Sequence, residues 1–87
     1  MPHSISLLVA KQPNIGKLVR GLRQELNLSQ EKFAAEFGVT FPTINRWENG
    51  HVTPSPLAIQ RISSLLNELG ERGQIIKATY LREEEFS

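Results

Sequence analysis

The chain has 87 residues and a formal net charge of +1 at pH 7, which limits it to one small domain. It has no cysteine, so disulfide bonds and thiolate metal sites are excluded. Its apolar runs are too short to span a bilayer, and its first residues lack the basic region of a secretory signal. We therefore expect a cytoplasmic protein with no membrane association, metal or cofactor.

Residues 1–14 read as an N-terminal extension. Ile5, Leu7 and Val9 alternate with their neighbours along this segment, a pattern compatible with a short strand. Pro13 and Asn14 end the extension, and we expect Asn14 to cap the helix that follows.

Apolar residues then recur at three- and four-residue spacing, which predicts a helix over residues 15–26. Ser29 is a suitable N-cap for a second helix over residues 30–37, and Gly38 can take the left-handed conformation that ends it. Thr40 can cap a third helix, which ends at Asn49 and Gly50.

Two more helices are predicted in the rest of the chain. Ser55 as cap and Pro56 at the first helical position begin a fourth helix over residues 56–69. Its apolar residues are expected to face the core, namely Leu57, Ile59, Ile62, Leu66 and Leu69. A fifth helix follows Gly70, with a strand over QIIKATYL as the competing interpretation. The expected fold is all-α, with a domain over residues 15–69 and a helix or tail over residues 70–87.

Residues 30–49 have the pattern of a helix-turn-helix. Ala34 is small enough for a crossing helix to approach closely, Gly38 permits a sharp turn, and Val39 fills that turn. Ile44 and Trp47 are spaced to anchor the second helix of the motif on the core. In such a motif the second helix stands out from the body of the protein and can enter the major groove of DNA.

The segment LSQEKFAAEFGVTFPTINRWENG resembles the signature of the phage-repressor and Cro-type helix-turn-helix regulators. The flanking stretches LVRGLRQELNLSQ and TPSPLAIQRISSLL also match that family, so the resemblance covers about residues 15–66. It implies a five-helix phage-repressor-like DNA-binding domain with the helix-turn-helix at about residues 30–49. It also implies that Gln30 clamps a phosphate, that Asn49 and His51 lie near the DNA backbone, and that Glu48 forms a structural ion pair with Arg23.

A helical wheel at 100° per residue separates two faces of the third helix. Ile44, Trp47 and Glu48 fall on the side that must anchor the helix. The DNA-binding candidates at this helix are Thr40, Phe41, Pro42, Thr43, Asn45, Arg46 and Asn49. Arg46 suits guanine O6 and N7, or alternatively touches a phosphate or lies in solvent. Asn45 suits adenine, or is simply a solvated polar residue.

Phe41 and Pro42 are unusual at the tip of a helix that reads DNA. Neither side chain can hydrogen-bond a base edge, but both can pack against the methyl group of thymine. The alternative is an apolar contact with another protein. Because the residue before a proline is disfavoured in helical geometry, we expect Phe41 to be extended and the helix to begin one residue later.

The charges and the residue inventory discriminate between function classes. Up to Leu66 the chain has seven basic and four acidic residues, and from Asn67 on it has three basic and five acidic residues. This distribution suits a nucleic-acid binder with an acidic end. No set of nucleophile, base and acid can be assembled, so we do not expect an enzyme. The predicted function is a sequence-specific double-stranded DNA-binding regulator of transcription that inserts residues 41–49 into the major groove.

Two further expectations concern protein partners. The alternative function is an antitoxin-type module whose partner is a toxin or another protein. A single motif reads few base pairs, so we also expect a homodimer on a two-fold DNA site. Its predicted contact is residues 67–87, because a domain complete by Leu69 leaves surplus apolar residues, namely Ile75, Ile76, Tyr80, Leu81 and Phe86. The alternative is that this segment folds back over the first helix.

Overall fold

The computed structural model describes residue 7 and residues 10–86, with the backbone alone for residues 82–86. These residues form five helices, and no strand occurs among them, so the all-α prediction is confirmed. The helices are α1 (Asn14–Glu25), α2 (Gln30–Phe37), α3 (Phe41–Glu48), α4 (Pro56–Glu68) and α5 (Glu71–Phe86). The strand predicted near residues 5–9 lies outside the described residues except for Leu7, which is buried.

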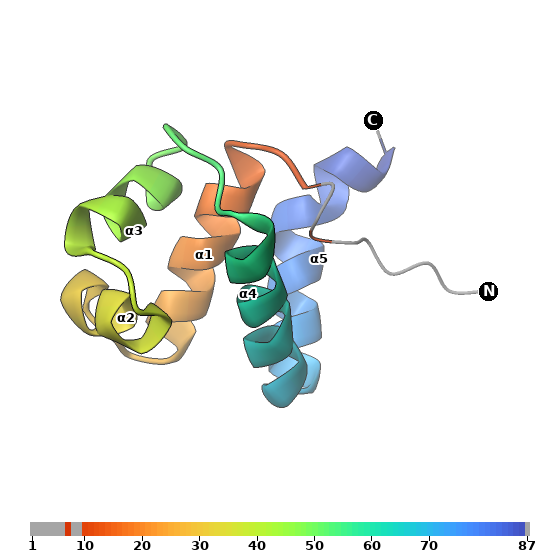
Figure 1. Cartoon of the computed structure of the whole chain (residues 1–87). Helices are drawn as coiled ribbons and strands as arrows, with labels where there is room; N and C mark the ends of the chain where they lie inside the picture. Colours follow the sequence, from red (N-terminus) through yellow and green to blue (C-terminus); the bar gives the residue numbers. More distant parts are fainter. Residues whose placement is uncertain (1–6, 8–9, 87) are drawn as a thin grey trace.

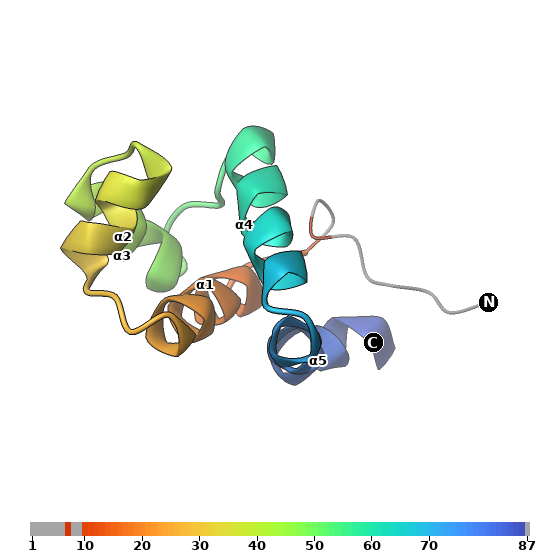
Figure 2. The same ribbon diagram turned by 90° about the horizontal axis from the view of Figure 1, so that it is seen from below.

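Helix α1 lies at the centre of the molecule (Figure 1). Helices α2 and α3 pack together on one side of it, and α5 packs along its other side. The view from below shows the same order, with α4 packed on α5 (Figure 2). The helix-turn-helix therefore stands at one end of the domain, away from the C-terminal helix.

Three of the helices begin at side-chain caps that the sequence predicted. Ser29 accepts from the Lys32 amide at 3.1 Å, and Ser55 accepts from the Ala58 amide at 3.2 Å. Thr40 accepts from the Thr43 amide at 3.3 Å. Each bond satisfies one of the amides that a first helical turn leaves without a partner.

The start of α3 differs from the prediction, because Phe41 is helical and not extended. Pro42 lies in the first turn, where its missing amide hydrogen would have had no intrahelical partner. The cap at Thr40 thus outweighs the bias that a proline imposes on the residue before it.

The start of α1 also differs, because Asn14 lies inside the helix and is not its cap. Pro13 occupies the cap position and offers no side-chain hydrogen bond. The Gln12 side chain takes over this role, since its Oε1 accepts from the Gly16 amide at 2.8 Å. The helix also ends at Glu25, one residue before the predicted boundary.

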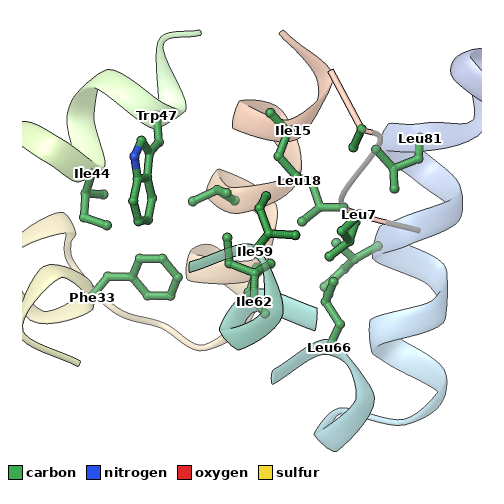
Figure 3. Packing of buried hydrophobic residues seen from close by; sticks show 14 of the residues in the cluster. Leu7, Ile15, Leu18, Phe33, Ile44, Trp47, Ile59, Ile62, Leu66 and Leu81 are labelled. Atoms are coloured by element: carbon green, nitrogen blue, oxygen red, sulfur yellow. The ribbon is translucent and has the colours of Figure 1, made fainter. Parts of the chain in front are cut away.

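A single apolar core joins all five helices (Figure 3). Phe33, Ile44 and Trp47 fix the helix-turn-helix to α1. Ile44 and Trp47 are the two anchors that the sequence predicted. On the other side of α1 the core continues through α4 into α5, where Ile76 and Leu81 are buried. The domain is therefore not complete at Leu69, and the expectation that these two residues are surplus to the core was wrong. The alternative, in which α5 folds back over α1, is the one observed.

Leu57 does not face the core as predicted, since it is 77% exposed. The buried face of α4 is set by Ile59, Ile62 and Leu66. Residues two positions apart on a helix are separated by about 200°, so Leu57 lies on the side opposite Ile59. There it borders a shallow pocket of about 180 Å³, together with Phe37, Val39, Ser55, Ala58 and Arg61.

Candidate nucleic-acid interface

The turn between α2 and α3 sets the position of α3, the second helix of the motif. Gly38 takes a left-handed conformation with φ of 69°, which a residue with a side chain adopts only at a cost. The Val39 amide donates to the Ala34 carbonyl at 3.0 Å and closes the end of α2. The chain then enters α3 through the cap at Thr40, so both ends of the three-residue turn are fixed by hydrogen bonds.

Helix α3 has the two faces that the helical wheel separates. Ile44, Trp47 and Glu48 are buried against the body of the domain. The outward residues are exposed or half-buried, namely Phe41, Pro42, Thr43, Asn45, Arg46 and Asn49. Of the other candidates, Gln30 is half-buried, and Thr40 and His51 are exposed. The structure thus brings most of the predicted DNA-binding residues onto one surface around α3.

A buried carboxylate lies behind this surface. Glu48 Oε2 accepts from Arg23 Nε at 2.6 Å, and Glu48 Oε1 accepts from Arg23 Nη2 at 3.1 Å. Arg23 also donates to the Leu28 carbonyl at 2.9 Å, which connects the end of α1 to the start of α2. The pair that the resemblance implied is therefore a two-bond contact joining α1 to α3.

The ion pair determines the charge state of both groups. Burial acts to raise the pKa of the Glu48 carboxyl, but the hydrogen bonds from Arg23 and Gln30 outweigh it and hold that pKa below its ordinary value. The hydrogen bond to Glu48 in turn raises the pKa of the Arg23 guanidinium. Both groups are consequently charged at neutral pH.

A chain of polar side chains connects Glu48 to the outward surface. Gln30 Nε2 donates to Glu48 Oε1 at 3.0 Å, and Asn45 Nδ2 lies 3.4 Å from Gln30 Oε1. Asn49 Nδ2 donates to Asn45 Oδ1 at 3.0 Å. Arg20 closes the ring, with Nη2 3.4 Å from Asn49 Oδ1 and Nε 3.4 Å from Glu48 Oε1. The orientations of the candidate reader Asn45 and the candidate phosphate ligand Gln30 are therefore set by neighbours within the protein.

Arg20 and Gln12 belong to this region but were not among the predicted site residues. Arg20 precedes Arg23 by three residues and so lies on the same face of α1, a spacing that could have indicated a second cation near Glu48. Gln12 gave no such signal, because it lies in the extension before the first helix.

Gln12 connects the C-terminal end of α3 to the start of α1 through hydrogen bonds. Its Nε2 donates to the Trp47 carbonyl at 3.1 Å and to the Val52 carbonyl at 2.7 Å. The helices approach closely here, since a Cβ added at Gly16 would lie 2.2 Å from the Trp47 carbonyl oxygen. The C-terminal end of α3 and the loop after it are therefore fixed to α1 by a side chain and by a backbone approach.

The described residues contain no group of three acidic or histidine side chains placed to hold a metal ion. Among the helices formed by these same residues, none combines the length and apolarity that crossing a membrane requires.

The fold and this surface define a small helix-turn-helix domain whose second helix is anchored on one face and open on the other. Comparison with known families gives the same class, because the Helix-turn-helix family model matches residues 19–72. That match covers more than half of the chain. The protein belongs to the Cro/C1-type helix-turn-helix family.

Three relatives among known proteins are similar to part of the chain. The chain is 36% identical over 62 residues to a protein of Sinorhizobium medicae named as an uncharacterized HTH-type transcriptional regulator. This match covers 66% of the chain and 45% of that relative, and a protein of Rhizobium meliloti with the same kind of name matches equally. A similarly named protein of Methanothermobacter thermautotrophicus is 43% identical over 49 residues, which are 56% of the chain and 71% of that protein. The chain thus spans less than half the length of the rhizobial relatives, and no solved structure matches it.

Proposed function

We propose that this protein is a sequence-specific double-stranded DNA-binding regulator of transcription that inserts α3, with Asn49, into the major groove. Membership of the helix-turn-helix family and the names of the relatives support a DNA-binding regulator. The observation that carries the finer proposal is the division of α3 into two faces. Ile44 and Trp47 hold the helix on the core, which leaves its opposite face free to meet base edges.

Arg46 is the residue that we expect to discriminate between bases. It is exposed on α3, and its planar guanidinium can donate two hydrogen bonds to O6 and N7 of a guanine. Arg46→Ala should weaken binding to the preferred duplex by about 1–3 kcal/mol and relax the preference for one guanine. The measurement is the dissociation constant on a duplex selected by the wild-type protein from a random pool, and on the same duplex with each guanine replaced in turn.

The control for this substitution is the effect of the same base changes on the wild-type protein. One guanine replacement should weaken wild-type binding and leave the Arg46→Ala variant unaffected. Equal weakening of the variant on all duplexes would show instead that Arg46 contacts a phosphate. We expect the Arg46→Ala variant to keep its fold, because the Arg46 side chain is exposed and lies outside the apolar core.

Phe41 is the residue that we expect to recognise a thymine by apolar contact. It lies at the first position of α3 and is 45% exposed, so its ring is available to a methyl group in the groove. Replacement of the contacted thymine by uracil should weaken wild-type binding by up to about 0.8 kcal/mol, the value of one buried methyl-sized group. In the Phe41→Ala variant the same replacement should have no effect. Uracil substitutions without effect on the wild-type protein would favour a protein contact at Phe41.

The expected homodimer stays a prediction, and the apolar surface that residues 70–87 leave for its contact is smaller than the sequence suggested. Of the apolar residues in 70–87, Ile76 and Leu81 are used by the core, whereas Ile75 is 59% exposed. An antitoxin-type role with a toxin or another protein as partner also stays the alternative. Salt separates the two functions, because DNA binding weakens steeply with salt through counterion release and an apolar protein contact does not.

A further inference from the structure

Two arginines of α1 approach the same buried carboxylate, and they do so unequally. Arg23 makes two hydrogen bonds to Glu48, at 2.6 and 3.1 Å, and its side chain is only 15% exposed. Arg20 lies one turn earlier, reaches Glu48 at 3.4 Å, and is 46% exposed. Arg23 is therefore the structural partner of Glu48, and Arg20 is a second cation beside a carboxylate that is already paired.

The charges of this cluster do not cancel. Arg20 and Arg23 contribute two positive charges and Glu48 contributes one negative charge, which leaves a net charge of +1. Because Arg23 is buried with Glu48, the excess charge resides on the exposed guanidinium of Arg20. Within the described part of the chain, its Nη1 has no hydrogen bond, so one edge of the planar group is available to a ligand.

Arg20 is also joined to the end of the reading helix. Its Nη2 lies 3.4 Å from Oδ1 of Asn49, the residue that follows the last turn of α3. Asn49 in turn donates to Asn45 on the outward face of that helix. In a docked helix-turn-helix the N-terminal residues of the second helix meet base edges, so its C-terminal end lies closer to the sugar-phosphate backbone.

We infer that Arg20 binds a phosphate of the DNA backbone through the free edge of its guanidinium, and that Glu48 and Asn49 hold it in position. This inference rests on the proposed function. A guanidinium can donate two parallel hydrogen bonds to a phosphate, which makes it well suited to this contact. The contact would carry no base preference and would make binding more dependent on salt.

The test is the salt dependence of DNA binding by the Arg20→Gln variant. Each phosphate contact on B-DNA contributes a slope of about 0.9 in the logarithm of affinity against the logarithm of salt concentration. The variant should lose about that much slope, which corresponds to about eightfold weaker binding at 0.1 M salt. The loss should be the same on the duplex selected by the wild-type protein and on an unrelated duplex of equal length.

Two control variants separate a phosphate contact from other effects. Arg72→Gln removes an equally charged, exposed side chain that pairs with Glu25, the last residue of α1, and it should leave affinity and slope unchanged. Arg20→Lys keeps the positive charge and should keep the wild-type slope. Melting curves of the Arg20 variants should lie close to that of the wild-type protein, because both hydrogen bonds of Arg20 are long and its side chain is half exposed.

The outcomes distinguish this inference from the proposed function. If Arg20→Gln binds DNA like Arg72→Gln, the phosphate contact is refuted while DNA binding stands. A weaker affinity with an unchanged salt slope also refutes it, because Arg20 would then act through the position of Glu48 or Asn49. A wild-type protein that binds no duplex, selected or unrelated, overturns the proposed function itself.

Discussion

Replacing Arg23 by alanine should lower the free energy of unfolding by about 3–5 kcal/mol. The substitution leaves the buried carboxylate of Glu48 without its main partner, and only Gln30 at 3.0 Å and Arg20 at 3.4 Å remain to stabilise its charge. It also removes the donor to the Leu28 carbonyl, which links α1 to α2. Equilibrium unfolding in urea, with the wild-type protein measured alongside, gives the difference directly.

Two other substitutions show whether this loss comes from the buried pair. Arg20→Ala should cost far less, because its guanidinium is half exposed and its bond to Glu48 is long. In a second variant, Arg23→Met combined with Glu48→Leu, the pair is replaced by apolar side chains, and most of the stability should return. A single Arg23→Ala substitution that costs no more than Arg20→Ala would contradict the structural role of the pair.

The same carboxylate predicts how stability depends on pH. The pKa of Glu48 is lower in the folded protein than its ordinary value of 4.5, so the folded state binds this proton less readily than the unfolded state. The resulting stabilisation is fully present above about pH 4.5 and is lost as the pH falls through the folded pKa. The Glu48→Gln variant lacks this titration, and its stability should decline less than that of the wild-type protein in that acidic range.

Replacing Phe33 by alanine should lower the free energy of unfolding by about 3–5 kcal/mol. Its ring is fully buried beside Ile44 and Trp47, at the point where the helix-turn-helix meets α1 (Figure 3). Truncation leaves a cavity at this junction and removes the contact with the Phe37 ring, whose centroid is 4.7 Å away. A small domain has a total stability of only about 5–15 kcal/mol, so part of the variant should be unfolded at moderate temperature.

Phe37 provides the matched control for this substitution. It lies one turn later on α2 and is the same residue type, but it is only half-buried and contacts the exposed Arg61. Phe37→Ala should therefore cost clearly less than Phe33→Ala in the same urea experiment. Equal losses for the two variants would mean that burial at the junction is not what makes Phe33 important.

The sequence by itself determined the elements of this protein that depend on near neighbours in the chain. The caps at Ser29, Thr40 and Ser55 are local hydrogen bonds across three residues, so residue type and spacing were enough to predict them. The turn at Gly38 depends on its own backbone conformation. The two faces of α3 follow from helical periodicity, which is why Ile44 and Trp47 were correctly predicted as its anchors.

Only the tertiary structure decided which apolar surfaces are covered. Leu57 was predicted to be buried and is exposed, because the face of α4 that packs is the one turned toward the shared core, and hydrophobicity alone does not choose it. Ile76 and Leu81 were predicted to be surplus and are buried, because α5 folds back against α1. Ile75 and Ile76 are neighbours in sequence, yet they point in directions about 100° apart and only one meets the core.

The tertiary structure also decided the polar contacts around α3. Gln12 and Arg20 are far from α3 in sequence, so no local pattern shows that one binds the Trp47 carbonyl and that the other reaches Asn49. The sequence predicted which face of α3 points outward, because the residues of this helix by themselves define its faces. The contacts that hold α3, and the cation beside its C-terminal end, depend on how closely α1 approaches this helix. Packing across the whole domain sets that distance.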